Sequence, residues 1–188
     1  MSNIVIISGS PSENSRSEKV LNYLGILLEQ EGFSITHISV KDVSSDVLFE
    51  GKYDSPEIHH ITALIQGAKG VIIGSPVYKG AYSGVLKALI DVLPQDVLKH
   101  TPVLPLMTGG SPSHQLALEY ALKPVLASLK AHNLKGLYFV DSQIDKENEI
   151  PIIDEDTLQR TKSQLNYFIQ LVNNSSFSSN LLAEPNYK

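Results

Sequence analysis

Five short apolar runs alternate with helical patterns along this chain of 188 residues. The predicted strands lie at 3–8, 33–40, 70–74, 103–107 and 137–140, and the alternating pattern of 33–40 suits a strand nearer the sheet edge. Between them, and after the last, apolar residues recur at helical spacing. Parallel neighbouring strands need crossover connections, which are almost always right-handed. The alternation therefore predicts an α/β fold, with a parallel sheet and helices on both of its faces.

The natural topology for five such strands is a flavodoxin-like, doubly wound sheet with strand order 2-1-3-4-5. In that order the ligand crevice lies outside the carboxyl ends of strands 1, 3 and 4. The loops richest in Ser, Gly and Pro follow these same strands, at 8–17, 75–83 and 108–114. The loops after strands 2 and 5 are acidic and irregular. We therefore expect a binding site where the three loops meet.

The bulk properties narrow the class of protein. The length predicts one domain over residues 1–174 and a tail over 175–188, flexible or ordered by an oligomer partner. A net charge of −5 with scattered Lys and Arg argues against nucleic acid as a partner. There is no cysteine, and no apolar run approaches the roughly 20 residues of a membrane span. With no signal-peptide pattern, the expectation is a cytoplasmic protein that does not bind membranes.

The first loop predicts an anion site. Ser8, Ser10, Ser15 and Ser17 supply hydroxyl donors, and Arg16 adds a planar guanidinium, all beside a helix N-terminus. Neither the GxGxxG spacing of dinucleotide folds nor a Gly-Lys-Ser/Thr triphosphate loop is present. A terminal phosphate monoester, such as that of FMN, suits these donors best. The alternative is a Ser-rich turn that only caps its helix, although a cap needs one serine.

The second loop places proline and glycine around an aromatic residue at the crevice mouth. A flat heteroaromatic ring can rest on such a backbone and receive main-chain hydrogen bonds at its edge. The predicted contacts are Pro76, Val77, Tyr78, Lys79 and Gly80, together with Ser83, a plausible N-cap of the next helix. An ordinary turn with an exposed tyrosine remains the alternative.

The third loop, Thr108, Gly109, Gly110 and Ser111, allows close approach of backbone N–H groups, because glycine has no β-carbon. Aimed at N1 and O2 of a flavin, such groups stabilise the negative charge that builds when the ring takes a hydride. Hydride transfer from a nicotinamide needs stacking and distance but no protein acid or base. The histidines lack ligand spacing, so no metal site is assigned.

A proline lies well inside the helix expected over about 112–132. Pro124 lacks the N–H that would bond the carbonyl of Tyr120, four residues earlier. A freed carbonyl favours a kink or a one-residue π-bulge, and such bulges often mark functional sites. The alternative is a simple proline kink that leaves Tyr120 buried in the core.

Residues 2–172 resemble the NADPH-dependent FMN reductases of the flavodoxin-like superfamily, especially the reductase components of two-component alkanesulfonate monooxygenases. The resemblance is carried by SGSPSENSRS, GSPVYKGAYSGVLKALIDVLP and LMTGGSPSHQLALEYALKPVLASLKA. It implies that FMN is a substrate, reduced with NADPH and handed to a separate FMNH2-dependent monooxygenase.

The resemblance also assigns roles to residues. It places the first-loop residues at the phosphate, Pro76–Gly80 at the ring edge and Thr108–Ser111 at the pyrimidine side. It matches Tyr120 to an inserted tyrosine that forms a π-helix at a tetramer interface and favours flavin release. We expect a homo-oligomer, either a dimer or a tetramer. The tail and residues 145–156 depart from the pattern of some relatives.

Two other functions remain open at this point. One is a reductase that retains FMN and acts on quinones, azo dyes or chromate, which would share all three loops. The other is a flavodoxin-type electron carrier without nicotinamide activity. Carriers usually have a tight Thr/Ser-rich phosphate turn and a strongly acidic face, whereas this chain has an arginine in a longer loop.

Overall fold

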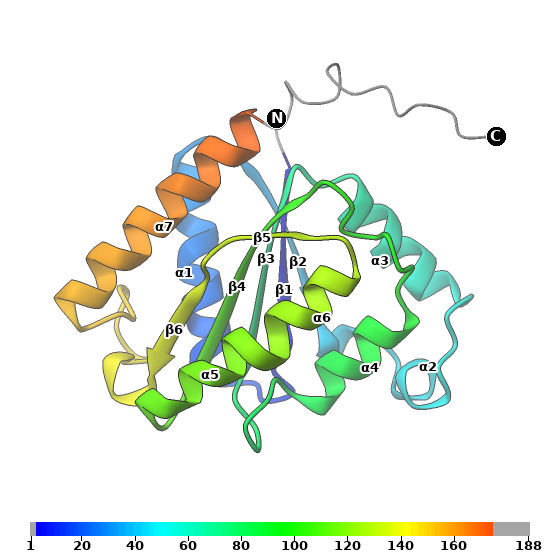
Figure 1. The fold of residues 1–188 in the computed structure, drawn as a ribbon, viewed down its shortest axis with the longest axis horizontal. Coiled ribbons are helices and arrows are strands. Elements are labelled where there is room, and N and C mark those ends of the chain that lie inside the picture. The colour runs from blue at the N-terminus through cyan, green and yellow to red at the C-terminus, as the bar shows by residue number, and fades with distance from the viewer. Residues whose placement is uncertain (1–2, 175–188) are drawn as a thin grey trace.

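The computed structural model describes residues 3–174, and the predicted tail at 175–188 lies outside this range. Its centre is a parallel sheet (Figure 1). The strands are β1 (Asn3–Ser8), β2 (Ser34–Ser39), β3 (Gly70–Pro76), β4 (Pro102–Gly109), β5 (His132–Asn133) and β6 (Leu137–Val140). They follow the order β2-β1-β3-β4-β5, with β6 also paired to β4. This confirms the predicted 2-1-3-4-5 order.

The fifth strand position is shared by two short strands, where the sequence predicted one. β5 pairs with the start of β4 and β6 with its end. Val103 pairs with Asn133, and Leu106 pairs with Leu137. The chain thus advances three residues along β4 but four residues between these partners in β5 and β6. Between them Pro105 has no N–H to donate to the ladder. Gly136, at φ +85°, provides the bend beside it.

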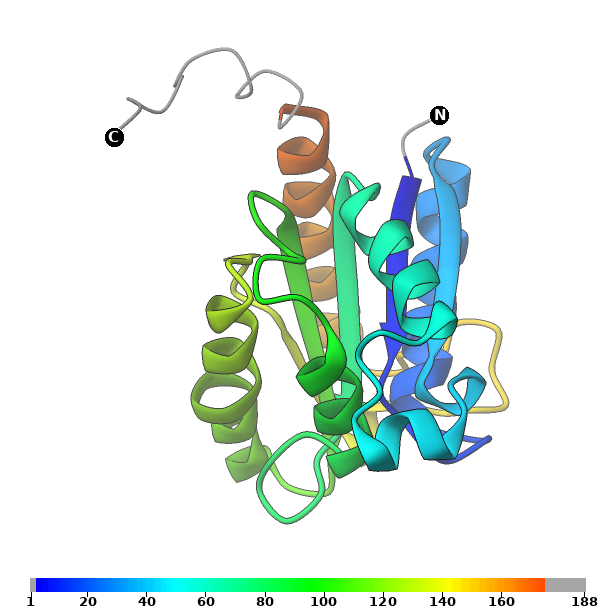
Figure 2. The ribbon, with the colours of Figure 1, turned by 90° about the vertical axis from the view of Figure 1, so that its right-hand side faces the viewer.

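Two apolar layers sandwich the sheet because successive strand residues point to opposite faces. Ile4, Ile6 and Ile72 pack under α1 (Arg16–Gln30) and α7 (Glu155–Asn174). Val5, Ile7, Val71 and Ile73 pack under the helices of the opposite face. Those helices include α3 (Pro56–Gln66) and α4 (Gly84–Val92). Figure 2 shows them in front of the strands, with α1 and α7 behind.

The segment over 112–128 is a composite helix. It runs from a 3₁₀ turn, η2 (Pro112–His114), through α5 (Gln115–Ala117) and a π-helical turn, η3 (Leu118–Leu122), into α6 (Lys123–Ser128). The predicted end at His132 was wrong by four residues. Lys130 adopts φ +64°, and His132 already belongs to β5.

The remaining elements are short. The polar stretch after β2 contains a 3₁₀ turn, η1 (Val40–Asp42), and a helix, α2 (Ser45–Glu50). Another 3₁₀ turn, η4 (Asp141–Gln143), follows β6. None of the helices within residues 3–174 is long and apolar enough to cross a membrane.

Candidate functional site

The three predicted loops meet at one cavity of about 210 Å³ beside the carboxyl ends of β1, β3 and β4. We call it the rim pocket. The first loop contributes Ser12, Asn14, Ser15 and Arg16. The second and third contribute Pro76, Val77, Tyr78, Thr108, Gly109 and Gly110, and Asp141 completes the lining. The convergence arises because parallel strands present all their carboxyl ends at the same edge of the sheet.

Ser15 positions the first loop as the N-cap of α1. Its backbone is extended (φ −89°, ψ 138°), and its hydroxyl accepts a hydrogen bond from the Glu18 N–H. The Ser15 and Ser17 hydroxyls lie 2.8 Å apart and share a hydrogen bond. The first N–H groups of a helix have no partner within the helix, so α1 directs its donors and its positive dipole end to this loop.

The other predicted serines of the first loop are buried and do not line the rim pocket. Ser10 and Ser17 are fully buried, and Ser8 is nearly so. The Ser10 hydroxyl accepts a hydrogen bond from the Ser12 N–H at 3.2 Å and so shapes the turn. The Ser8 hydroxyl has no hydrogen-bond partner within the described residues. Of the four, only Ser15 reaches the cavity lining.

Arg16 is the cation of the rim pocket. Its guanidinium lies 3.9 Å from the Asp141 carboxylate, and both side chains are 41% exposed. The Arg16 Nε is buried and has no hydrogen-bond acceptor within residues 3–174. A buried, charged donor without an acceptor is unfavourable. The arrangement therefore fits an anionic ligand that supplies the acceptor, as the phosphate of FMN does.

The second loop is a tight turn closed by a bridge between Tyr78 and Ala81. Lys79 and Gly80, at its tip, have φ values of +51° and +79° and do not line the cavity. The Val77 N–H donates to the Thr108 carbonyl at 2.7 Å, which ties the second loop to the third. Pro76, Val77 and Tyr78 are thereby held at the cavity wall.

Ser83 joins the first two loops from behind the pocket. It is fully buried, and its hydroxyl accepts a hydrogen bond from the Leu86 N–H and donates to the Gly9 carbonyl. This confirms Ser83 as the N-cap of α4. Its backbone N–H donates to the Ser75 hydroxyl. The Ser83 hydroxyl is thus committed to the protein, and the structure keeps it out of the cavity lining.

A tyrosine from β6 supports the third loop. The Tyr138 hydroxyl donates a hydrogen bond to the Ser111 carbonyl. A β-carbon on Gly109 would lie 2.8 Å from that hydroxyl, so a larger residue there would displace the Tyr138 side chain. Burial raises the pKa of Tyr138, and the charge of Asp141 raises it further. The phenol therefore stays protonated and keeps donating well above neutral pH.

Asp141, Ser12 and Asn14 line the rim pocket but were not among the predicted site residues. Asp141 follows β6, and the loop after the fifth strand was set aside as acidic and irregular. The available signal was its place directly after a strand whose carboxyl end lies at the same rim. Ser12 and Asn14 lie inside the predicted loop 8–17, and the hydroxyl of Ser12 is the same signal that selected the other serines of that loop.

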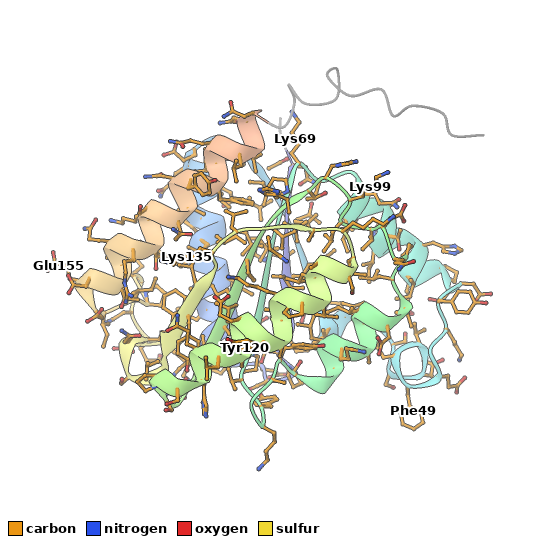
Figure 3. All side chains as sticks on the ribbon, viewed as in Figure 1. Phe49, Lys69, Lys99, Tyr120, Lys135 and Glu155 are labelled. Atoms are coloured by element: carbon orange, nitrogen blue, oxygen red, sulfur yellow. The ribbon has the colours of Figure 1, made fainter. Side chains whose placement is uncertain are left out.

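The predicted distortion at Tyr120 is a π-helical turn over Leu118–Leu122. The Lys123 N–H bonds the Leu118 carbonyl, five residues back, which is the hydrogen bond of a π-helix. Tyr120 itself is 79% exposed, so the alternative of a buried tyrosine was wrong. Figure 3 labels Tyr120 on the composite helix, and it is not part of the rim pocket.

A larger hollow of about 670 Å³ lies between α2 and α4. It is an open, mainly apolar surface that contains none of the predicted site residues. The rim pocket is therefore the better candidate, because within residues 3–174 it combines the loop predicted to bind an anion with the two loops predicted to contact a planar ring.

Comparisons with known proteins identify the family of the chain. The family model described as NADPH-dependent FMN reductase matches residues 2–146. An FMN reductase (NADPH) of Escherichia coli K12 is 38% identical over 168 residues, covering 89% of this chain and 88% of the relative. Its counterpart from Pseudomonas putida KT2440 is 44% identical over 142 residues, covering 75% of this chain and 72% of the relative.

A solved structure of NADH:FMN oxidoreductase (EMOB) in its apo form superposes with a TM-score of 0.81. It is 33% identical to this chain, and the match covers 98% of this chain and 92% of that one. Sequence and structure thus point to the same group of flavin enzymes. The chain belongs to the NADPH-dependent FMN reductase family of flavodoxin-like oxidoreductases.

Proposed function

We propose that this enzyme binds FMN in the rim pocket as a substrate, reduces it with NADPH and releases it to a partner monooxygenase. The family reaction uses FMN and NADPH. The observation that carries the site assignment is the unpaired, buried Arg16 Nε beside the N-terminus of α1. It needs an acceptor, and a phosphate monoester supplies one with a matching charge.

The residues of the rim pocket take distinct roles in this proposal. Arg16, Ser15 and the helix N-terminus bind the phosphate. Pro76–Tyr78 contact the ring edge, and Thr108–Gly110 approach the pyrimidine side, while Ser111, which is outside the pocket lining, caps the turn η2. FMN, once bound, accepts a hydride from the nicotinamide, so the protein needs only to orient the two and exclude water. The buried serines Ser8, Ser10, Ser17 and Ser83 and the turn residues Lys79 and Gly80 shape the loops around it.

The π-helical turn supports the proposal that FMN is released rather than retained. Tyr120 protrudes from it and is 79% exposed in the single chain. A large aromatic side chain in such a position is typical of an interface residue. We propose that Tyr120 packs between subunits of a homotetramer and so keeps the third loop, which leads into this helix, in a weakly binding form.

The downstream step follows from the resemblance of the sequence to sulfonate-linked reductases. A reductase that releases reduced FMN needs an acceptor that uses it with oxygen. We propose an FMNH2-dependent monooxygenase that cleaves sulfonates for sulfur assimilation in the cytoplasm. An FMN-retaining quinone, azo or chromate reductase is the main alternative, because it would use the same pocket.

Deleting Tyr120 tests the release step. The purified wild-type protein should be colourless and follow sequential kinetics with NADPH and FMN. The deletion variant should retain FMN, appear yellow and turn over free FMN more slowly. Tyr167→Ala is a matched control, because Tyr167 is a half-exposed tyrosine on α7, away from the rim pocket.

Flavin absorbance of the purified proteins and light scattering after gel filtration provide the readouts. A colourless deletion variant with unchanged turnover and subunit number would contradict the role of Tyr120. A wild-type protein that purifies yellow and shows ping-pong kinetics would favour the FMN-retaining alternative. Failure to oxidise NADPH when FMN is added would contradict the reductase function itself.

A further inference from the structure

A second cavity of about 210 Å³ opens at the outer edge of the sheet. We call it the edge pocket. It lies between β6, the start of α5 and the first half of α7, and its lining includes Gln115, Lys135, Tyr138, Thr157, Arg160 and Gln164. Figure 3 shows Lys135 beside β6 and α7. Lys135 and Arg160 are the charged residues of this lining, and no carboxylate from residues 3–174 belongs to it.

Both cations of the edge pocket lack an ion-pair partner within residues 3–174. The carboxylate that Arg160 influences is that of Asp154, but Asp154 accepts a hydrogen bond from the Thr157 N–H at 2.8 Å. Arg160 and Asp154 therefore interact through space but form no ion pair. Two cations without an ion-pair partner around one cavity produce a positive potential that favours an anion.

Arg160 is held in place by buried groups. Its Nη2 donates to the Thr157 hydroxyl oxygen at 3.0 Å, and Thr157 is 3% exposed. The same oxygen accepts a hydrogen bond from the Gln143 Nε2 at 2.8 Å. Gln143 in turn accepts from the Val140 N–H. Anchored at one nitrogen, the guanidinium keeps its other donors in a fixed orientation, which lowers the entropic cost of binding a ligand.

A further polar group in the pocket needs a donor. The Gln164 side-chain oxygen is buried and has no hydrogen-bond partner within the described residues. An anion alone supplies no donor to it. A ligand that carries a phosphate next to a hydroxyl group satisfies both the cations and this amide.

The edge pocket and the rim pocket are physically connected. Tyr138 lines the edge pocket, and its hydroxyl holds the third loop through the Ser111 carbonyl. The turn η4 provides a second link, because Asp141 lines the rim pocket and Gln143 anchors Arg160 through Thr157. The short turn η4 therefore joins a residue of the rim pocket to the group that anchors Arg160 in the edge pocket.

We propose that the edge pocket binds the 2′-phosphate of NADPH. Arg160 and Lys135 contact the phosphate, and the Gln164 side-chain oxygen accepts a hydrogen bond from a ribose hydroxyl. The inference rests on the proposed function and assigns the residues that distinguish NADPH from NADH. An arginine that contacts the 2′-phosphate is a general solution to this recognition problem. The relatives of this chain include proteins named for either nucleotide, so the choice must depend on local residues.

The test compares Arg160→Gln and Lys135→Gln with Lys162→Gln, which removes an exposed charge from α7 outside the edge pocket. The two pocket variants should lower kcat/KM for NADPH by roughly 10- to 100-fold, because each loses a charge-assisted contact. Values for NADH should stay within about two-fold. Lys162→Gln should leave kcat/KM unchanged for both NADPH and NADH. The kcat/KM of Arg160→Lys for NADPH should lie between those of Arg160→Gln and the wild type.

An equilibrium measurement separates binding from turnover. Calorimetric titration of the flavin-free protein with 2′,5′-ADP should show tighter binding than with 5′-AMP, and Arg160→Gln should abolish the difference. Equal losses with NADPH and NADH, or no preference of the wild type for 2′,5′-ADP, would overturn the inference. So would binding of 2′,5′-ADP that does not compete with NADPH.

These failures differ from a failure of the proposed function. A protein that reduces FMN equally well with both nucleotides, and whose pocket variants behave as the wild type does, remains a reductase with a wrongly assigned edge pocket. A protein that oxidises neither nucleotide in the presence of FMN contradicts the reductase assignment. The titration with 2′,5′-ADP then tests, independently of turnover, whether the edge pocket binds the 2′-phosphate.

Discussion

The rim pocket and the edge pocket have the same volume, about 210 Å³, but they differ in charge, because one is lined by a cation and a carboxylate and the other by two cations. In the rim pocket Arg16 faces Asp141 at 3.9 Å, and most other lining groups come from neutral turns. In the edge pocket no carboxylate from residues 3–174 lines the cavity beside Lys135 and Arg160. The first pocket suits recognition by shape and neutral donors, and the second suits recognition by charge.

This difference matches what each proposed ligand has to do. A flavin that must leave after reduction is better served by one balanced cation than by several unpaired ones, because charge-assisted contacts are the strongest polar ones. A phosphate that only distinguishes two nucleotides gains most where cations are unneutralised. Each of the following experiments alters one pocket and uses the other as its reference.

The largest effect should come from Arg16→Gln. Loss of the one cation that residues 3–174 contribute to the lining of the rim pocket should weaken FMN binding by roughly 10- to 100-fold, because a charge-assisted hydrogen bond contributes about 1.5–3 kcal/mol. Fluorescence titration measures this affinity. Riboflavin, which lacks the phosphate, should bind both proteins alike, and Arg160→Gln should leave FMN binding unchanged. A uniform loss for FMN and riboflavin would place the phosphate elsewhere.

Gly109→Ala tests the wall that the two pockets share. Its β-carbon would lie 2.8 Å from the Tyr138 hydroxyl and 3.3 Å from the Val77 β-carbon. Overpacking of this kind lowers the free energy of unfolding by about 1–3 kcal/mol. Urea denaturation measures it. Gly110→Ala is the control, because a β-carbon there meets only Asp141 at 3.9 Å. Equal stabilities of the two variants would refute the close approach at Gly109.

Asp141→Asn should make the rim pocket resemble the edge pocket. Removing the carboxylate leaves Arg16 unneutralised, so FMN binding should tighten by about two- to five-fold, a modest gain because both side chains are partly exposed. The gain should shrink at high salt, since exposed charges are screened. Titration at two ionic strengths provides the check. Weaker FMN binding in this variant would show that Asp141 contacts the ligand favourably.

The smallest effect concerns the pH dependence of Tyr138. Burial raises its pKa, so the folded state holds the proton more tightly than the unfolded chain. The associated stability is present below the ordinary tyrosine pKa of about 10 and is lost as the pH rises through the higher folded value. At neutral pH Tyr138→Phe should cost about 1 kcal/mol through the lost Ser111 hydrogen bond.

The stability gap between wild type and Tyr138→Phe should therefore narrow above pH 10. Denaturation of both proteins at several pH values measures this gap in the free energy of unfolding. Burial also raises the pKa values of Tyr23 and Tyr82, but both proteins contain these residues, so their contributions cancel in the gap. A gap that stays constant with pH would show that the Tyr138 phenol is not protected in the folded protein.

Local patterns were sufficient for the inner part of the fold. Buried apolar runs identified β1, β3 and β4, and the order of strands followed from their alternation with helices. Pro124 predicted a distortion of its helix, because proline lacks the backbone N–H wherever it occurs, and the structure has a π-helical turn there. The split of the edge strand at Pro105 and Gly136 was not predictable in this way, since it depends on which side of β4 lacks a donor.

The candidate site also has features that the sequence determined and features that the tertiary structure decided. The sequence by itself determined the three loops, because glycine, proline and serine limit the backbone wherever they occur. Only the tertiary structure decided which side chains line the pockets. It buried Ser10 and Ser83 and brought Asp141 to Arg16. It also brought Gln143 to Thr157. Such pairings depend on distances between residues far apart in the chain or on helix packing, and no local preference encodes them.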